Sequence, residues 1–283
     1  TVFANLLGLV KIRTGASFVY FVILHDKDLL VYILDKISIL LSFIFKKKYI
    51  VVRISSEPYL RNKLITRISL GNKNSTAGNK KQIYIPLFFQ AIYLNEYNPK
   101  EIIPRFSQKI KKNQIHNKRK IDERYYSKSF SGVIFSGKSY PIRELIVNAI
   151  SEVMPVAKYG IACNNKFEGS KHLLQKEHLF CICPENFIRE GYCSEKVVEA
   201  YLSGYIPIYW NHPKNIEGIF NNNSIVNLYG LDKEQIKQKL IQITTNRDLL
   251  KDIYESPLFD KNFNVEEVIQ EFELNFIEAL NDL

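Results

Sequence analysis

The stretch from Leu179 to Gly230 constrains the fold of this 283-residue chain more than any other segment. It begins with a short apolar run, 179–183, which is followed by a proline and is typical of a buried parallel strand. After a polar loop, Ser194 stands where a helix N-cap is expected, ahead of an apolar stripe with helical spacing. A second apolar run, 206–210, completes a strand, helix and strand unit, whose strands should be parallel with a right-handed connection. The loop after the first strand therefore opens into a helix N-terminus, which favours an anion such as a phosphate.

A similar unit opens the second half of the chain. Residues 132–135 are predicted to form a strand, and a helix is predicted over 142–153 with Pro141 at its first position. Arg143 falls in the first turn of that helix, where a guanidinium can bind a diphosphate through two parallel hydrogen bonds. The alternative is an exposed helix arginine that binds nothing.

The first half of the chain also shows a β-α-β pattern. Strands are predicted at 28–33 and 49–54, on either side of a mostly apolar helix at 34–45. The second of these strands leads into a Ser-Ser-Glu-Pro turn, at the sheet edge where open α/β sheets bind their ligands. Glu57 in this turn is therefore placed to act as a base, and a carboxylate that only caps the turn is the alternative.

Composition agrees with an α/β protein of two domains. The length favours two domains of roughly 100 to 150 residues, and 46% hydrophobic residues are enough for two cores. A net charge of +10 predicts attraction to anions, which include a nucleotide diphosphate, an anionic membrane surface and a nucleic acid. The four cysteines lack Cys-x-x-Cys spacing, which favours a reducing compartment and argues against a zinc site.

Residues 107–128 are strongly basic and show little apolar periodicity. We expect a solvated linker, with an anionic membrane surface as the alternative partner. The aromatic residues that base stacking requires are limited here to Tyr125 and Tyr126, which argues against nucleic acid.

Two apolar runs near the beginning of the chain, 16–24 and 37–45, are each about half of the roughly 18 residues that a membrane-spanning helix needs. They are predicted to be a buried strand and a buried helix. Because the chain begins at Thr1 rather than at methionine, an upstream anchor stays open as an alternative.

Three motifs lie close together in the segment from Leu179 to Gly230. They are Pro-Glu-Asn at 184–186, Gly-Tyr-x-Ser-Glu-Lys at 191–196 and Tyr-x-x-Gly-x-Ile-Pro-Ile-Tyr-Trp at 201–210. Together they resemble the donor-binding signature of the α1,3/α1,4-fucosyltransferases, glycosyltransferase family ten. The 136–143 stretch is similar to the family segment whose arginine contacts the donor phosphates, with Gly137-Lys138 in place of the usual Asn-Pro.

The resemblance implies an α/β fold of GT-B architecture, with two facing Rossmann-like domains and parallel sheets. It implies an inverting transfer of L-fucose from GDP-β-L-fucose to a hydroxyl of a glycan acceptor, in α1,3 or α1,4 linkage to a GlcNAc-type sugar, with Glu57 as general base. No cofactor or catalytic metal is expected. The donor contacts it implies are Lys138, Arg143, Glu185, Asn186, Tyr192, Ser194, Glu195 and Lys196.

The expected domains are an acceptor-binding domain at 1–125 that ends in the basic linker, a GDP-fucose-binding domain at 126–262 and an amphipathic C-terminal helix at 263–283. The expected partners are GDP-fucose, a glycan acceptor such as a surface glycan or lipopolysaccharide, and peripherally an anionic membrane. The location would be cytoplasmic or at the cytoplasmic membrane face in a bacterium, and the Golgi membrane in a eukaryote. Another GDP-sugar, an inactive sugar-nucleotide-binding relative, and a basic RNA- or membrane-surface-binding protein without catalysis are the alternatives. The sequence determines neither the acceptor nor the oligomeric state.

Overall fold

The computed structural model describes the chain in separate stretches. These are residues 9–14, 17–25, 48–55, 67–70, 82–85, 88, 119–121, 130–165, 174, 177–264, 267–268, 270–271 and 274. The chain divides into two compact units, one composed mainly of Thr1–Phe89 and the other mainly of Gln90–Arg189 and Cys193–Phe263. The predicted domain boundary at residue 125 stays a prediction.

A five-stranded sheet in the order β1-β2-β3-β4-β5 makes up the described elements of the first unit. Its strands are β1 (Leu9–Thr14), β2 (Ser17–His25), β3 (Lys48–Ser55), β4 (Arg67–Leu70) and β5 (Gln82–Ile85). The pairs from β2 to β5 are parallel, whereas β1 and β2 form an antiparallel hairpin at the edge. The strand predicted at 49–54 is confirmed as β3, and the run at 16–24 corresponds to β2. The strand predicted at 28–33 and the helix at 34–45 lie outside the described residues.

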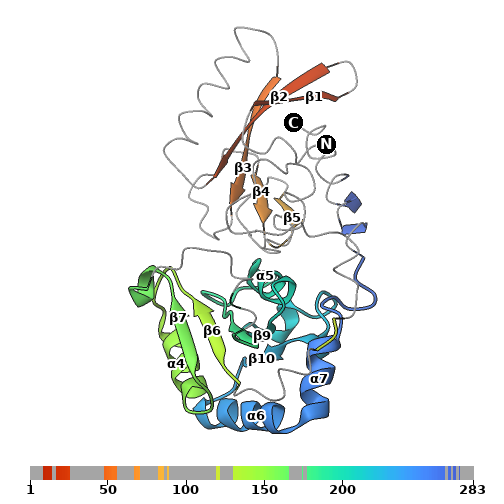
Figure 1. Ribbon diagram of the computed structural model, residues 1–283. Helices are drawn as coiled ribbons and strands as arrows, with labels where there is room; N and C mark the ends of the chain where they lie inside the picture. The colour runs from red at the N-terminus through yellow and green to blue at the C-terminus, as the bar shows by residue number, and fades with distance from the viewer. Residues whose placement is uncertain are drawn as a thin grey trace. The chain divides into compact units, whose positions relative to one another are not determined.

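The second unit contains a five-stranded parallel sheet in the order β10-β9-β8-β6-β7 (Figure 1). Its strands are β6 (Gly132–Phe135), β7 (Val156–Tyr159), β8 (Phe180–Ile182), β9 (Ile206–Tyr209) and β10 (Val226–Asn227). The chain runs from β6 outward to β7, returns to β8 on the other side of β6, and continues outward to β9 and β10. The direction of winding therefore reverses between β6 and β8. In open α/β sheets this switch point is where a crevice forms at the carboxyl ends of the strands.

Four helices accompany this sheet among the described residues of the second unit. They are α4 (Pro141–Ser151), α5 (Lys196–Leu202), α6 (Lys233–Thr245) and α7 (Arg247–Glu255). Because right-handed crossovers that run in opposite directions leave a sheet on opposite sides, α4 and α5 cover opposite faces. The α6 helix packs against α4 and α7, which places all three on the α4 face (Figure 1). The strands predicted at 132–135, 179–183 and 206–210 are confirmed as β6, β8 and β9, and the helix predicted at 142–153 is confirmed as α4, with ends that differ by at most two residues.

The apolar faces of the strands and of these three helices form the main core of the second unit. Its most deeply buried members include Ile146, Ile150, Phe180, Ile206, Leu228, Ile236, Leu240 and Leu250. Phe130 packs edge-on against Phe180, with ring centroids 6.3 Å apart, and so covers the start of β8. Burial of this apolar surface fixes the strand order, and with it the position of the loops at the carboxyl edge.

Most of the predicted C-terminal helix lies outside the described residues. No helix within the described stretches is long and apolar enough to cross a membrane.

Candidate functional site

The loop between β6 and α4 is held against the end of β7. Ser136 N donates a hydrogen bond of 2.7 Å to Tyr159 O, and Ala162 N donates one of 3.1 Å to Ser136 O. Gly160 makes this close approach with a φ of 114°, and a Cβ there would lie 2.2 Å from Ser136 O. Only glycine fits such a position, because a side chain would clash with the backbone and strain the left-handed conformation. The glycine therefore fixes the place of Ser136 at the carboxyl edge of the sheet.

Arg143 lies in the first turn of α4, and its side chain is buried. Its Nη1 donates to Ser136 Oγ over 2.9 Å and to Lys138 O over 3.1 Å, and its Nη2 donates to Asn186 Oδ1. The guanidinium carbon also lies 4.9 Å from the centroid of the Tyr140 ring. These four partners orient the guanidinium at the edge of the sheet.

Glu185 follows β8 and is fully buried, with a carboxylate that accepts hydrogen bonds from three residues. Oε1 accepts from Ser194 N over 2.8 Å and from Tyr209 Oη over 2.6 Å, and the Ser194 hydroxyl lies 2.8 Å from both carboxylate oxygens. Oε2 forms an ion pair of 2.6 Å with Lys196 Nζ. A buried carboxylate is stable only when it is paired and hydrogen-bonded, and this one is both.

Asn186 joins the two cationic side chains of the site. Its Oδ1 accepts a hydrogen bond from Arg143 Nη2 and another, of 3.3 Å, from Lys196 Nζ. The side chain of Lys196 is 21% exposed, so this residue is partly accessible to solvent. Two positive charges from opposite sides of the switch point therefore meet around one amide oxygen, at the edge of the sheet where a ligand is expected.

A chain of polar side chains behind Glu185 was not predicted from the sequence. Tyr209 Oη, which donates to Glu185, accepts from Asn211 Nδ2 over 2.9 Å, and Asn215 Nδ2 donates to Asn211 Oδ1 over 2.8 Å. Burial raises the pKa of Tyr209 well above its ordinary value, so its hydroxyl stays protonated and remains a donor. The signal that could have pointed to two of them is their place at the end of β9: Tyr209 is its last residue, and Asn211 directly follows the apolar run at 206–210.

Two of the predicted donor contacts, Glu185 and Ser194, are buried. Glu185 is 0% exposed and Ser194 is 2% exposed, and both hold Lys196 in place, while their contact with a donor stays a prediction. Ser194 is also not the N-cap: α5 begins at Lys196, and Glu195 stands at the N-cap position with no side-chain capping bond. The Ser194 hydroxyl lies within 3.5 Å of Lys196 N, so it supports the first turn without being its cap.

The remaining predicted contacts lie around this cluster. Lys138 is exposed, and its carbonyl accepts from both Ser136 Oγ and Arg143. Tyr192 is buried in the loop before α5. Glu195 is half-buried, and burial, with a smaller contribution from Glu199, raises its pKa above the ordinary value of 4.5. No ligand contact is assigned to these three by geometry alone, and their roles stay predictions.

The thiols of the second unit do not form a metal site. Cys181, Cys183 and Cys193 are buried, and all four cysteines are free. Burial raises the pKa of Cys183 and of Cys193, which makes both poor metal ligands and poor nucleophiles. Among the described residues, no group of three or more histidine, cysteine, aspartate or glutamate side chains is arranged to hold a metal ion.

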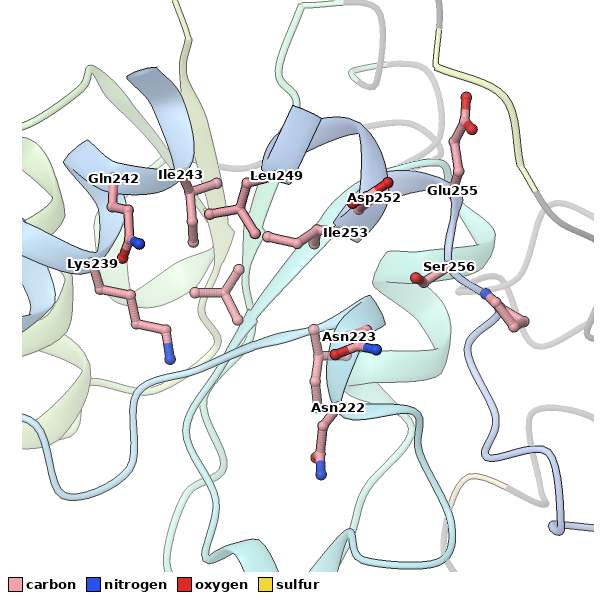
Figure 2. Close-up of a pocket in the computed structure, with 13 residues that line it drawn as sticks. Asn222, Asn223, Lys239, Gln242, Ile243, Leu249, Asp252, Ile253, Glu255 and Ser256 are labelled. Carbon is pink, nitrogen blue, oxygen red and sulfur yellow. The ribbon is translucent and has the colours of Figure 1, made fainter. Parts of the chain in front are cut away.

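A cavity of about 640 Å³ lies elsewhere in the second unit, between η6 (Asn222–Ser224), α6 and α7 (Figure 2). Its lining includes Lys239, whose Nζ donates to Asn227 O over 3.0 Å and whose pKa is lowered by burial. None of the predicted site residues lines it. We place the candidate site at the switch point because the charged and polar side chains converge there.

The predicted base, Glu57, lies outside the described residues. The strand before it is described: β3 ends at Ser55, and it pairs in parallel with β2 and β4. Glu57 therefore follows the carboxyl end of a central strand of the first sheet by two positions, as expected from the sequence.

Fold and site together define an α/β protein with two cationic side chains at the switch point of a parallel sheet, the edge at which open α/β sheets bind nucleotides. Comparison with known proteins gives the family. Residues 129–271, which are 143 of the 283, match the model of glycosyltransferase family 10 (fucosyltransferase), C-terminal part. The chain belongs to this family.

An α-(1,3)-fucosyltransferase of Helicobacter pylori, FucT, is 29% identical over 135 residues. The match covers 46% of this chain and 28% of that protein, so the chain spans less than a third of this relative's length.

Solved structures of α1,3-fucosyltransferase share the fold. One with GDP has a TM-score of 0.58 and 20% identity, and covers 97% of this chain and 95% of the other. One with GDP-fucose has a TM-score of 0.54 and 19% identity, with coverage of 96% and 94%. The predicted fold class, α/β of the GT-B type, is thereby confirmed.

Proposed function

We propose that this chain binds GDP-fucose and transfers fucose to a hydroxyl group of a glycan acceptor. The observation that carries the proposal is the convergence of Arg143 and Lys196 on Asn186 Oδ1 at the switch point. The guanidinium of Arg143 and the ammonium of Lys196, which is also paired with Glu185, can both donate charge-assisted hydrogen bonds to a diphosphate, and such bonds are among the stronger hydrogen bonds in proteins. A related α1,3-fucosyltransferase has been solved with GDP-fucose, which supports the same donor here.

The proposed reaction is a direct displacement at the anomeric carbon of fucose. Glu57 takes the proton of the acceptor hydroxyl as its oxygen attacks, and the bond between the sugar and GDP breaks. Attack from the opposite face converts the β-linked donor into an α-linked product. Negative charge grows on the departing diphosphate, where Arg143 and Lys196 stabilise it.

Glu185 has a supporting role in this proposal. Its ion pair with Lys196 and its bonds from Ser194 and Tyr209 fix the direction of the ammonium group before a donor arrives. A fixed cation loses little side-chain entropy on binding, so the buried network favours donor affinity. Glu195, half-buried next to this lysine, is proposed to accept hydrogen bonds from the ribose hydroxyls.

The two cations supply the positive charge that a metal ion would otherwise provide, so we expect activity to persist in EDTA. The linkage proposed is α1,3 or α1,4 to a GlcNAc-type sugar.

The test is donor binding followed by transfer. Calorimetric titration of GDP, GDP-fucose and a uridine diphosphate sugar should show binding of the two guanosine compounds. Lys196→Ala should weaken GDP binding about tenfold to a hundredfold, because a charge-assisted bond to phosphate contributes about 1.5 to 3 kcal/mol. Lys251→Ala removes an exposed lysine of α7 and is the matched control, with an unchanged dissociation constant.

Binding of the uridine sugar without binding of GDP would overturn the donor assignment. Binding of GDP-fucose without release of GDP in the presence of any of a panel of glycans would favour the inactive relative. A basic RNA-binding protein would instead bind RNA with an affinity that falls steeply with salt, whether or not GDP is present.

A further inference from the structure

The basic composition of residues 107–128 predicts a solvated linker, but the side chain of Arg119 is not solvated in this way. Its guanidinium lies among three backbone carbonyls: Nε donates to Tyr254 O over 3.0 Å, and Nη1 donates to Tyr201 O over 3.0 Å and to Tyr205 O over 2.8 Å. At this residue the expectation of a solvated charge was wrong. The reason is that a planar guanidinium carries five donors and can serve several carbonyls at once.

Two aromatic rings enclose the same guanidinium. Its central carbon lies 3.6 Å from the centroid of the Tyr201 ring and 4.2 Å from that of the Tyr254 ring. Burial lowers the pKa of Arg119, and the two tyrosines partly oppose that shift. Arginine remains charged under these conditions, so the contacts combine cation–π attraction with charge-assisted hydrogen bonds.

The residues that follow Arg119 contact the same part of the second unit. Ile121 N donates to Glu255 Oε1 over 3.2 Å, and the Ile121 side chain belongs to the main core. Residues 119–121 are therefore packed onto the second unit rather than extended into solvent.

The carbonyls that Arg119 binds belong to the elements that carry the candidate site. Tyr201 O is one of the last carbonyls of α5, which has Lys196 as its first residue. Seven helical residues span about 10 Å, so Arg119 holds one end of a short helix whose other end presents the site lysine. Tyr205 directly precedes β9, the strand that ends in Tyr209, a hydrogen-bond donor to Glu185.

Tyr254 O adds a second anchor. It lies in the last turn of α7, so one guanidinium joins the carboxyl ends of two helices. A cation is favoured there because the partial negative charges of both helix ends point toward it. The Tyr201 hydroxyl, which donates to Ser256 O over 2.9 Å, links the same two elements independently.

We propose that Arg119 is a positioning residue for the donor site. It fixes α5 and the start of β9, so that Lys196 Nζ stays within hydrogen-bond distance of Asn186 Oδ1. The proposal rests on the function proposed above. The geometric basis is the length of one hydrogen bond. The bond from Lys196 Nζ to Asn186 Oδ1 is already 3.3 Å long, so a small displacement of α5 would break it. Truncation of Arg119 would remove a donor from three carbonyls, of which Tyr201 O would keep its bond from Gly204 N, and would release the far end of that helix.

The experiment compares Arg119→Ala and Arg119→Lys with Ile121→Ala. The isoleucine variant is the control because it removes a core side chain from the same short segment without touching α5. Each is measured for thermal stability, for the dissociation constant of GDP well below the unfolding temperature, and for hydrogen exchange of the α5 amides. All variants retain Arg143, Asn186 and Lys196.

We expect Arg119→Ala to bind GDP about tenfold more weakly, the loss of roughly one charge-assisted contact. Arg119→Lys should recover part of that loss, since a lysine keeps the charge and can reach one or two of the carbonyls. Exchange of the α5 amides should rise in the alanine variant. Ile121→Ala should lose stability but bind GDP within about twofold of the unchanged protein.

Two results would overturn the proposal. One is that Arg119→Ala and Ile121→Ala weaken GDP binding equally, because the arginine would then be purely structural. The other is that Arg119→Ala keeps the original GDP affinity and α5 exchange. If the unchanged protein binds no GDP, the proposed function fails, and the exchange of the α5 amides still decides whether Arg119 holds this helix. If the alanine variant does not fold, the lysine variant carries the same comparison.

Discussion

Replacement of Asn186 by aspartate should change stability and donor affinity in opposite directions. The amide oxygen of Asn186 accepts hydrogen bonds from Arg143 and from Lys196. In Asn186→Asp, a carboxylate of nearly the same shape would occupy that place, and the two hydrogen bonds would become ion pairs. The folded protein should therefore become more stable, and its affinity for an anionic ligand should fall.

The gain in stability follows from the exposure of the partners. Arg143 is buried and Lys196 is only partly exposed, but the Glu185 carboxylate that already pairs with Lys196 would repel the new charge, so each new ion pair should contribute only about 0.5 kcal/mol. Two such pairs amount to about 1 kcal/mol, which raises the melting temperature of a chain of this size by about 2 to 4 °C.

The loss of affinity follows from Coulomb repulsion. A carboxylate about 6 Å from a phosphate charge opposes it by about 3 kcal/mol at an effective dielectric constant of 20. That energy corresponds to about a hundredfold weaker binding. Arg143 and Lys196 would in addition be partly neutralised by the new charge.

Scanning fluorimetry gives the melting temperature and calorimetric titration gives the dissociation constant of GDP, both at 0.15 M salt. Asn223→Asp is the control, because Asn223 is exposed in η6 and its replacement alters the net charge equally without a charge beside the site. GDP affinity equal to that of the unchanged protein would refute the claim that the two cations bind a diphosphate. A lower melting temperature would refute the bridging role of Asn186.

Three further predictions concern single positions. Gly160→Ala should cost about 2 kcal/mol or more, seen as a lower urea midpoint, because its Cβ would meet Ser136 O at a positive φ; an unchanged midpoint would contradict this. Glu195→Gln should raise the melting temperature at pH 7: a raised carboxyl pKa means that the fold loses stability as pH rises through it, so the gain should vanish below pH 4.5. The same variant should bind GDP more weakly. If the difference in melting temperature between Glu195→Gln and the unchanged protein is the same at every pH, the raised pKa of Glu195 is contradicted. Iodoacetamide should label only Cys163 in the folded protein and all four thiols in guanidinium, as counted by mass spectrometry, since Cys163 alone is half-exposed; native labelling of a second thiol would contradict this.

Local elements of the second unit could be predicted from the sequence because their signals are local. Pro141 suits the first position of a helix, and α4 begins at this residue, one position before the predicted range of 142–153. Asp232 and Gln235 form a capping box at the start of α6, which is a local signal of three residues' spacing. The periodicity of apolar residues supplies the rest, since a helix or a strand must bury one face wherever it lies in the fold.

Interactions between distant segments could not be predicted in the same way. The hydrogen bond from Arg119 to Tyr254 joins residues 135 positions apart, and no local pattern distinguishes this arginine from its basic neighbours. The antiparallel strand β1 was not expected either, because its pairing with β2 depends on the formation of a sheet edge. Ser194 had the right type for an N-cap, but the buried carboxylate of Glu185 holds its hydroxyl instead.

Some features of the candidate site could likewise be predicted from the sequence, and others could not. The amino-acid sequence by itself determined that an arginine follows one strand and that an asparagine and a lysine follow another, each near a helix start. It also determined the family through the motifs from residue 184 to residue 210. Only the tertiary structure decided that β6 and β8 are neighbours, so that Arg143 and Lys196 meet at Asn186, 43 and 10 positions away along the chain. The physical reason is that strand order results from burial and pairing across the whole sheet, which no short stretch of sequence encodes.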